Sequence, residues 1–154
     1  MANRRRQLER LNEYVFTDKD WNTFLNNELA NSALTIKDKT AIIQDGKTVL
    51  NFTKSDGMSQ NITLIDKDNL YNNVVQVINQ YVPEGGKHAN RYDVTILVNG
   101  LPMVQIELKR RGVDIREAFN QINRYQKESF WAGKALFEYV QLFVISNGTF
   151  TRYY

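Results

Sequence analysis

Three residues near the middle of the chain have the types and spacing of a metal-dependent hydrolytic site. Asp93 lies in one β-branched stretch, while Glu107 and Lys109 lie in a second stretch that follows Asn99-Gly100. Two carboxylates on cross-strand neighbours, with Cβ atoms about 5 Å apart, repel each other unless a proton or a cation lies between them. Magnesium takes hard oxygen ligands, and a lysine beside it orients or activates a water molecule. These residue types therefore predict magnesium-assisted hydrolysis.

A β-hairpin must bring these residues together. Asn-Gly between two alternating runs is the strongest short-range hairpin signal. Side chains alternate faces along a strand, so one face of the hairpin is entirely apolar and is expected to be buried. The alignment of the two apolar faces places Asp93 opposite Glu107, with Lys109 further along the same polar face. The alternative is a half-exposed hairpin whose outer face is merely polar. The six apolar residues are Val94, Ile96, Val98, Val104, Ile106 and Leu108.

Composition bounds the class of protein. The chain has 154 residues with 42% hydrophobic and 24% charged content, as in an ordinary globular protein of one domain. A net charge of +3 permits nucleic-acid contact, and the basic run Arg4–Arg6 is either a solvated helix end or a phosphate contact. The absence of cysteine excludes disulfides and thiolate metal sites. Without a membrane-length apolar run or a secretory signal, we expect a cytoplasmic protein that has no membrane partner.

The segment before the hairpin is predicted to contain two helices and several strands. Thr17 or Asp18 caps the second helix, in which large apolar residues recur at helical spacing. Asp45-Gly46 is a further hairpin signal within a β-rich segment. A high β-branched content before Pro83 favours a strand there. The expected helices cover 4–14 and 18–31, and the expected strands cover 40–43, 48–52, 61–65 and 74–82.

The segment after the hairpin is predicted to contain a helix and two strands. Asp114 and Glu117 form a capping-box pattern for a helix over 115–129. Gln121 and Tyr125 lie on its flank, where they either pack at the boundary or project towards Asp93 and Glu107. The strands expected to follow are 139–145, which is apolar on both faces, and 149–154.

Two features of the loop over 83–90 resemble functional residues, but neither is assigned a functional role. Gly85-Gly86-Lys87 lacks the earlier glycine and the following Ser or Thr of a phosphate-binding loop, so we expect no nucleoside triphosphate site there. His88 is the only histidine and is expected to be incidental.

The order of these motifs resembles the PD-(D/E)xK nuclease superfamily, with Tyr92 in place of the proline. It is closest to the nuclease domain of the restriction (R) subunit of type I restriction–modification enzymes. The resemblance implies an α/β fold of the α+β type, with a restriction-endonuclease-like core and a mixed β-sheet flanked by helices. It implies a single endonuclease domain over 1–154, with an N-terminal portion over 1–66 and a nuclease core over 67–154, truncated at both ends. The matching segments are Asn90–Val94, Val98–Pro102, Ile106–Lys109, Ala118, Gln121–Tyr125, Leu136-Phe137 and Val140–Phe143.

The resemblance also assigns roles. Asp93, Glu107 and the backbone carbonyl of Leu108 are implied to bind Mg²⁺, and Lys109 is implied to be the catalytic lysine. Gln121 and Tyr125 match the Gln-x-x-x-Tyr motif of RecB-like nucleases, which supports the site and DNA contact. The remaining basic candidates for DNA contact are Arg110, Arg111 and Arg124, and the nearest candidates for a helix-borne acidic ligand are Glu9 and Glu13.

The implied function is that of a type I site-specific deoxyribonuclease, of which this chain is the nuclease domain only. Its DNA cleavage is expected to be Mg²⁺-dependent and without sequence specificity of its own. Its implied partners are double-stranded DNA and the modification and specificity subunits, while ATP serves a motor in the full-length subunit and is not bound here. The alternatives are a non-catalytic module that binds DNA or docks subunits, and a stand-alone repair nuclease.

Overall fold

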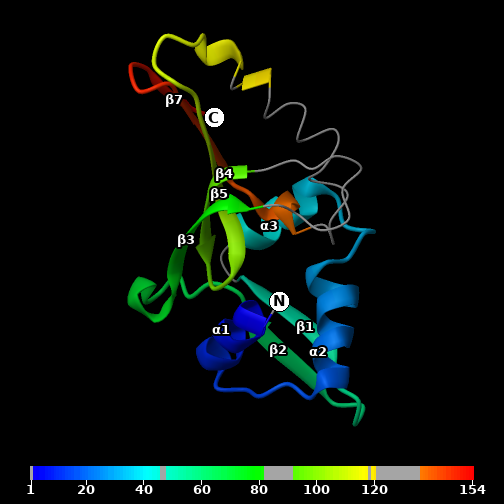
Figure 1. Cartoon of the computed structure of the whole chain (residues 1–154). Coiled ribbons are helices and arrows are strands. Elements are labelled where there is room, and N and C mark those ends of the chain that lie inside the picture. The colour runs from blue at the N-terminus through cyan, green and yellow to red at the C-terminus, as the bar shows by residue number, and fades with distance from the viewer. Residues whose placement is uncertain (1, 46–47, 82–91, 118, 121–135) are drawn as a thin grey trace. The chain divides into compact units, whose positions relative to one another are not determined.

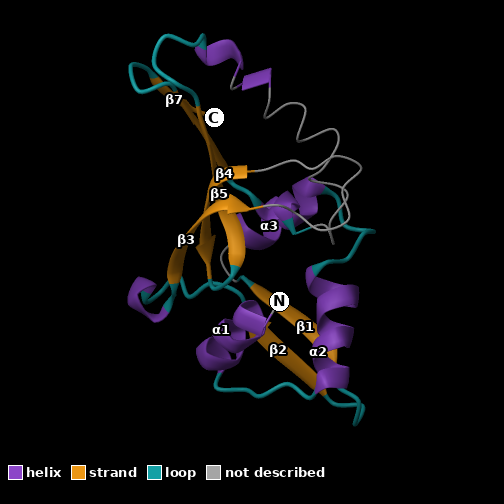
Figure 2. Ribbon diagram, in the orientation of Figure 1, coloured by secondary structure: helices purple, strands orange, loops and turns teal. Residues whose placement is uncertain are grey.

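The chain folds into helices, a two-stranded sheet and a five-stranded mixed sheet, which confirms the expected α+β class (Figure 2). The computed structural model describes residues 2–45, 48–81, 92–117, 119–120 and 136–154. The described chain divides into two compact units, Met1–Gln76 with Val98–Leu101 and Val77–Leu97 with Pro102–Tyr154. The elements are α1 (Ala2–Asn12), α2 (Asp18–Phe24), a π-helical turn (Leu25–Leu29), α3 (Ile36–Gln44), β1 (Val49–Thr53), β2 (Ser59–Thr63), β3 (Val75–Tyr81), β4 (Tyr92–Val98), β5 (Leu101–Leu108), β6 (Leu142–Ser146) and β7 (Thr151–Tyr153), with short 3-10 turns at Leu70–Asn72 and Phe137–Tyr139.

The first unit has an aromatic core beneath α2. Thr17 caps this helix, because its Oγ1 accepts a hydrogen bond from the Asp20 amide at 3.1 Å. Buried Asp20 in turn accepts the Ser55 amide at 2.8 Å, which ties the helix to the turn between β1 and β2. Both predicted N-terminal helices are thus confirmed, and the second continues into the π-helical turn. The core rings are Phe16, Trp21, Phe24 and Phe52, with Tyr14 at their edge.

The strand predicted over 40–43 is wrong, because these residues belong to α3. Thr35 begins this helix with a capping box: its hydroxyl accepts the Asp38 amide, and the Asp38 carboxylate accepts the Thr35 amide at 2.8 Å. β1 pairs instead with β2, antiparallel, across a turn at Lys54–Gly57. The capping box outweighs the local strand preference of the β-branched residues.

The tip of the central hairpin is held by a polar network within the first unit. Asn99 is completely buried and has a positive φ of 49°, which suits the tight turn between β4 and β5. Its side-chain amide donates to the Leu64 carbonyl at 2.9 Å and to Asn73 Oδ1 at 2.8 Å, and its Oδ1 accepts the Val74 amide at 2.9 Å. The predicted hairpin is therefore confirmed, and its turn is fixed by buried hydrogen bonds.

The larger sheet has the strand order β3-β4-β5-β6-β7 (Figure 1). β5 and β6 run parallel with Glu107 paired to Ile145, and β6 and β7 run antiparallel with Ile145 paired to Arg152. The predicted strands at 74–82 and 149–154 are confirmed as β3 and β7. The strand predicted at 139–145 begins later, at Leu142, because the 3-10 turn Phe137–Tyr139 precedes it.

The prediction that the apolar face of the hairpin is the buried one is wrong. The fully buried side chains are Thr95, Gln105 and Glu107, on the polar face, whereas Leu108 on the apolar face is 47% exposed. The Thr95 hydroxyl donates to Gln105 Oε1 at 2.8 Å, so these two polar groups satisfy each other. Burial of the polar face removes Glu107 from water, and this determines the chemistry of the site.

Candidate active site

Asp93 and Glu107 come from adjacent strands of the larger sheet. The side chain of Asp93, on β4, accepts a hydrogen bond from the Leu108 amide of β5, with Oδ2 and N separated by 2.8 Å. This bond and the Thr95–Gln105 bond agree with the expected alignment, in which Asp93 lies opposite Glu107. The hairpin therefore brings the two carboxylates together on its buried face.

Glu107 is the most perturbed acid of the described site. Burial, the largest cause, and the nearby charge of Asp93 raise the pKa of Glu107 to about 7, although Lys109 acts in the opposite direction. One carboxylate oxygen, Oε1, accepts Lys109 Nζ at 3.0 Å. The other, Oε2, is buried and has no hydrogen-bond partner among the described residues. A buried carboxylate oxygen without a partner is costly unless a cation or a proton reaches it.

Lys109 follows directly after the end of β5. Its backbone amide donates to the Ser146 carbonyl of β6 at 2.8 Å, which extends the parallel pairing past the strand end. Its ammonium contacts Glu107 and is partly exposed to solvent. The three predicted catalytic residues thus meet at the carboxyl end of β5, where one side of the lysine is open to a substrate.

The donors present at this point fit a magnesium ion. Two carboxylates supply hard oxygen ligands, and the free Oε2 of Glu107 is an available ligand atom. Among the described residues, no group of three or more acidic, histidine or cysteine side chains could hold a metal ion. The backbone carbonyl of Leu108 remains the further ligand that the family resemblance implies. Magnesium commonly keeps several waters and binds through only one or two carboxylates.

The other predicted site residues have different outcomes. Arg110 and Arg111 are exposed beside the site. Gln121, Arg124 and Tyr125 lie outside the described residues, as does the loop with Gly85-Gly86-Lys87 and His88.

In the N-terminal helix, part of the basic run has structural partners. Arg4 Nε donates to the Gly100 carbonyl at 3.0 Å, and Arg5 pairs with Glu9 at 2.9 Å. The same Glu9 oxygen also accepts the Phe16 amide. Arg6 is exposed, as is Glu13.

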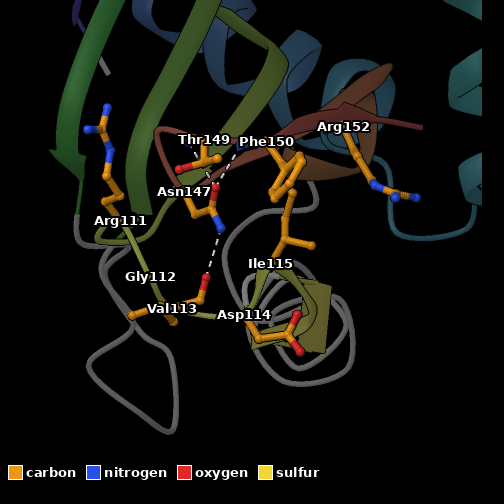
Figure 3. Close-up of a pocket in the computed structure, with 9 residues that line it drawn as sticks. All are labelled: Arg111, Gly112, Val113, Asp114, Ile115, Asn147, Thr149, Phe150 and Arg152. Atoms are coloured by element: carbon orange, nitrogen blue, oxygen red, sulfur yellow. Dashed lines mark hydrogen bonds between the residues drawn. The ribbon is translucent and has the colours of Figure 1, made fainter.

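Sequence reasoning missed a hollow beyond the carboxyl ends of β5 and β6. It is lined by the segment that follows β5 and by the turn between β6 and β7, and it has a volume of about 520 Å³ (Figure 3). Its central residue is the buried Asn147. The Asn147-Gly148 turn and the basic residues near it were the available signal, but their convergence depends on the parallel pairing of β5 and β6.

Comparison with known proteins identifies the family. The family model for the type I restriction enzyme R protein N terminus matches residues 1–154. The chain belongs to this family. The family match confirms the resemblance predicted from the motifs around Asp93 and Glu107.

Relatives of this R protein N-terminal region include endonuclease subunits of named type I restriction enzymes. The EcoprrI endonuclease subunit of Escherichia coli is 54% identical over 154 residues, which cover 100% of this chain and 49% of the relative. The SauCOLORF180P endonuclease subunit of Staphylococcus aureus strain COL is 39% identical over 153 residues, covering 97% of this chain and 15% of the relative. The chain thus spans about half the length of the first relative and much less of the second. No helix among the described residues is long and apolar enough to cross a membrane.

Proposed function

We propose that this chain is a magnesium-dependent endonuclease domain that hydrolyses DNA phosphodiester bonds without sequence specificity of its own. The observation that carries the proposal is the buried Oε2 of Glu107, which lies beside Asp93 and Lys109 and has no hydrogen-bond partner in the part of the chain that the structure describes. Membership of the R protein N-terminal family, and the naming of relatives as endonuclease subunits, support the same activity. We also propose that residues 1–66 and 67–154 are portions of a single nuclease domain.

Asp93, Glu107 and the Leu108 carbonyl are the groups that would hold the metal ion. A bound Mg²⁺ supplies Lewis-acid stabilisation of phosphate charge and a lowered pKa for a water molecule. The hydrogen bond from the Leu108 amide fixes Asp93 and leaves the second oxygen of its carboxylate for a ligand. The pairing of β5 with β6 fixes the backbone on which Glu107 is carried. The protein thus preorganises the acidic groups before DNA arrives.

Lys109 has two roles in the proposed reaction. The oxygen of a water molecule forms a bond to phosphorus while the water gives up one proton to the solvent. The bond from phosphorus to one ester oxygen breaks, and the departing oxygen takes up a proton from the solvent. Negative charge increases on the phosphate oxygens during this step, and the Lys109 ammonium stabilises it. The same ammonium orients the attacking water, because it is held at 3.0 Å from Glu107 Oε1 and is partly exposed.

The proposed partners follow from this activity and from the relatives. The substrate is double-stranded DNA, and the modification and specificity subunits of a type I complex supply target recognition. ATP is used by a motor region of the full-length subunit and not by this domain. A cytoplasmic location agrees with these partners.

Plasmid cleavage by the reconstituted complex tests the activity. The full-length subunit that carries this region is assembled with its partner subunits and supplied with Mg²⁺ and ATP. We expect Asp93→Asn, Glu107→Gln and Lys109→Ala each to reduce cleavage by roughly a hundredfold or more, because each removes a group that stabilises the transition state. The matched control is Glu117→Gln, which removes an exposed carboxylate on the helix after the site.

Metal binding is measured separately, without DNA. Mg²⁺ or Mn²⁺ is expected to raise the melting temperature of the wild-type chain and of Glu117→Gln, since a ligand that binds only the folded state stabilises it. The same ions should leave Asp93→Asn and Glu107→Gln unchanged. If neither metal changes the melting temperature of the wild type and the site variants still cut DNA, the proposal is wrong. If neither metal changes that melting temperature and no variant affects DNA binding, a non-catalytic module is the better description.

A further inference from the structure

The hollow formed by the segment after β5 and the turn after β6 has the size of a ligand site. Its volume of about 520 Å³ lies within the range of small-molecule and nucleotide pockets. The walls combine an aromatic ring, aliphatic surface and two guanidinium groups, contributed by Phe150, Ile115, Arg111 and Arg152 (Figure 3). In open α/β sheets, ligands bind outside the carboxyl ends of the strands, and this hollow lies where β5 and β6 end.

Buried Asn147 holds the two walls together. Its side-chain amide donates to the Val113 carbonyl at 2.8 Å, which joins the turn after β6 to the segment after β5. Its Oδ1 accepts the Thr149 amide at 3.0 Å and the Phe150 amide at 2.8 Å. Both ends of this side-chain amide are therefore used to build the wall, and the hollow is a preformed feature of the fold.

The apolar part of the hollow lies between its charges. The Phe150 side chain lies beside Ile115, and the Phe150 residue is 63% exposed (Figure 3). Arg111 and Arg152 extend to opposite sides of this apolar surface (Figure 3). Among the described residues that line the hollow, Asp114 is the acidic one, and it accepts the Arg116 amide at 2.9 Å as part of a helix start. Two exposed cations on either side of an exposed aromatic ring are the features that bind unpaired nucleic acid.

The hollow is also continuous with the proposed site along the chain. Arg111 lies two residues after Lys109, and the Lys109 amide is bonded to the carbonyl of Ser146, which directly precedes Asn147. A DNA strand whose phosphate contacts Lys109 would therefore have its neighbouring nucleotides near Arg111 and Phe150.

We propose that this hollow binds an unpaired segment of the DNA strand beside the bond that is cut. One base stacks on Phe150, and the phosphates on its two sides contact Arg111 and Arg152. Stacking on an aromatic ring tolerates any base, which agrees with a nuclease that has no sequence specificity of its own. This inference rests on the proposed DNA endonuclease function and extends it to the conformation of the bound strand.

Binding of fluorescent oligonucleotides to the full chain in EDTA tests the inference without cleavage. Phe150→Leu keeps apolar bulk but removes the ring, and we expect it to weaken single-stranded binding roughly tenfold while duplex binding changes little. Arg152→Gln is expected to lower the dependence of log K on log salt by about 0.7 for single strands. The control, Arg116→Gln, removes an exposed guanidinium that does not line the hollow.

The inference is overturned if Phe150→Leu and Arg152→Gln bind single strands as Arg116→Gln does. It is also overturned if Phe150→Leu weakens duplex and single-stranded binding equally. A base in a duplex remains stacked on its neighbouring bases and cannot stack on the Phe150 ring, so only single-stranded binding should depend on that ring. Circular dichroism checks that each variant folds. If Glu107→Gln and Lys109→Ala instead cut plasmid DNA as well as the wild type does, the proposed function is wrong. The two failures are therefore distinguishable.

Discussion

Glu107 combines complete burial with a negative charge that the described protein only half compensates. Lys109 contacts one of its oxygens, and the other has no partner within the described residues. Such a group destabilises the metal-free fold when it is ionised, because desolvation disfavours the charged form. In the proposed function, the same property favours binding of a cation. Under that proposal, stability and metal binding oppose each other at this residue.

This opposition predicts an unusual pH dependence of stability. Because the pKa of Glu107 is raised from 4.5 to about 7, the unfolded chain loses this proton first as the pH rises. For this one group, the metal-free protein should therefore become less stable between about pH 4.5 and pH 7, by about 3.5 kcal/mol at most, since each pKa unit corresponds to about 1.4 kcal/mol. Glu107→Gln should remove that loss and be the more stable protein at pH 8. Denaturant melts in EDTA at pH 5 and pH 8 measure both effects.

Glu117→Gln is the control for the pH experiment, because its carboxylate is exposed. It should follow the wild-type change between pH 5 and pH 8. A wild type and a Glu107→Gln variant with the same pH dependence would mean that Glu107 is not held in a desolvated environment.

At the scale of elements, the hairpin of β4 and β5 requires a glycine at its tip. Gly100 has a positive φ of 79°, and a Cβ there would lie 2.7 Å from Arg4 Cα and 2.8 Å from Arg4 Cβ. Gly57, in the turn between β1 and β2, has a similar φ of 85° but nothing within 4 Å of such a Cβ. An alanine at Gly57 would therefore meet backbone strain alone, whereas an alanine at Gly100 would meet backbone strain and a steric clash with Arg4.

We expect Gly57→Ala to cost about 1 kcal/mol, from backbone strain alone. Gly100→Ala should cost about 3 kcal/mol or more, because the turn must also move away from α1. Denaturant unfolding of both variants at pH 7 measures the difference. Equal losses would show that α1 is not packed against the turn.

At the scale of the whole molecule, the net charge of +3 is too small to bind DNA strongly through a general field. Under the proposed function, DNA contact is therefore expected to depend on particular basic residues. Arg4 and Arg5 already bind Gly100, Glu9 and Asp18 within the first unit, whereas Arg110 and Arg111 are exposed next to the proposed site. We therefore expect Arg110 and Arg111 to contribute more to DNA binding than exposed lysines elsewhere in the chain.

The prediction is a local salt dependence. Replacing Arg110 and Arg111 together by alanine should reduce the slope of log K against log salt for duplex binding by about 1.8, or about 0.9 for each phosphate that an arginine no longer neutralises. Replacing exposed Lys19 and Lys37 by alanine removes the same charge and should leave the slope nearly unchanged. Fluorescence anisotropy between about 50 and 200 mM salt measures both slopes. Equal reductions would show that binding is a general charge effect.

The sequence by itself determined the hairpin and the meeting of three residues on it. Asn99-Gly100 defines the turn, and strand alternation then places Asp93, Glu107 and Lys109 on one face. Both patterns are local, which is why they were readable without a structure. The helix α2, marked by its cap Thr17 and by the apolar spacing of Trp21 and Phe24, was predicted for the same reason.

The tertiary structure decided which face of the hairpin is buried, and therefore the properties of Glu107. Alternation distinguishes two faces but does not say which one other parts of the protein cover, and the Thr95–Gln105 hydrogen bond makes burial of a polar face tolerable. The strand expected at 40–43 became α3, because a capping box and packing outweighed local propensity. The hollow at Asn147 was also invisible, since its walls meet only through the pairing of β5 with β6. The sequence thus specified which groups would gather, while long-range packing fixed their exposure to water and hence their charge.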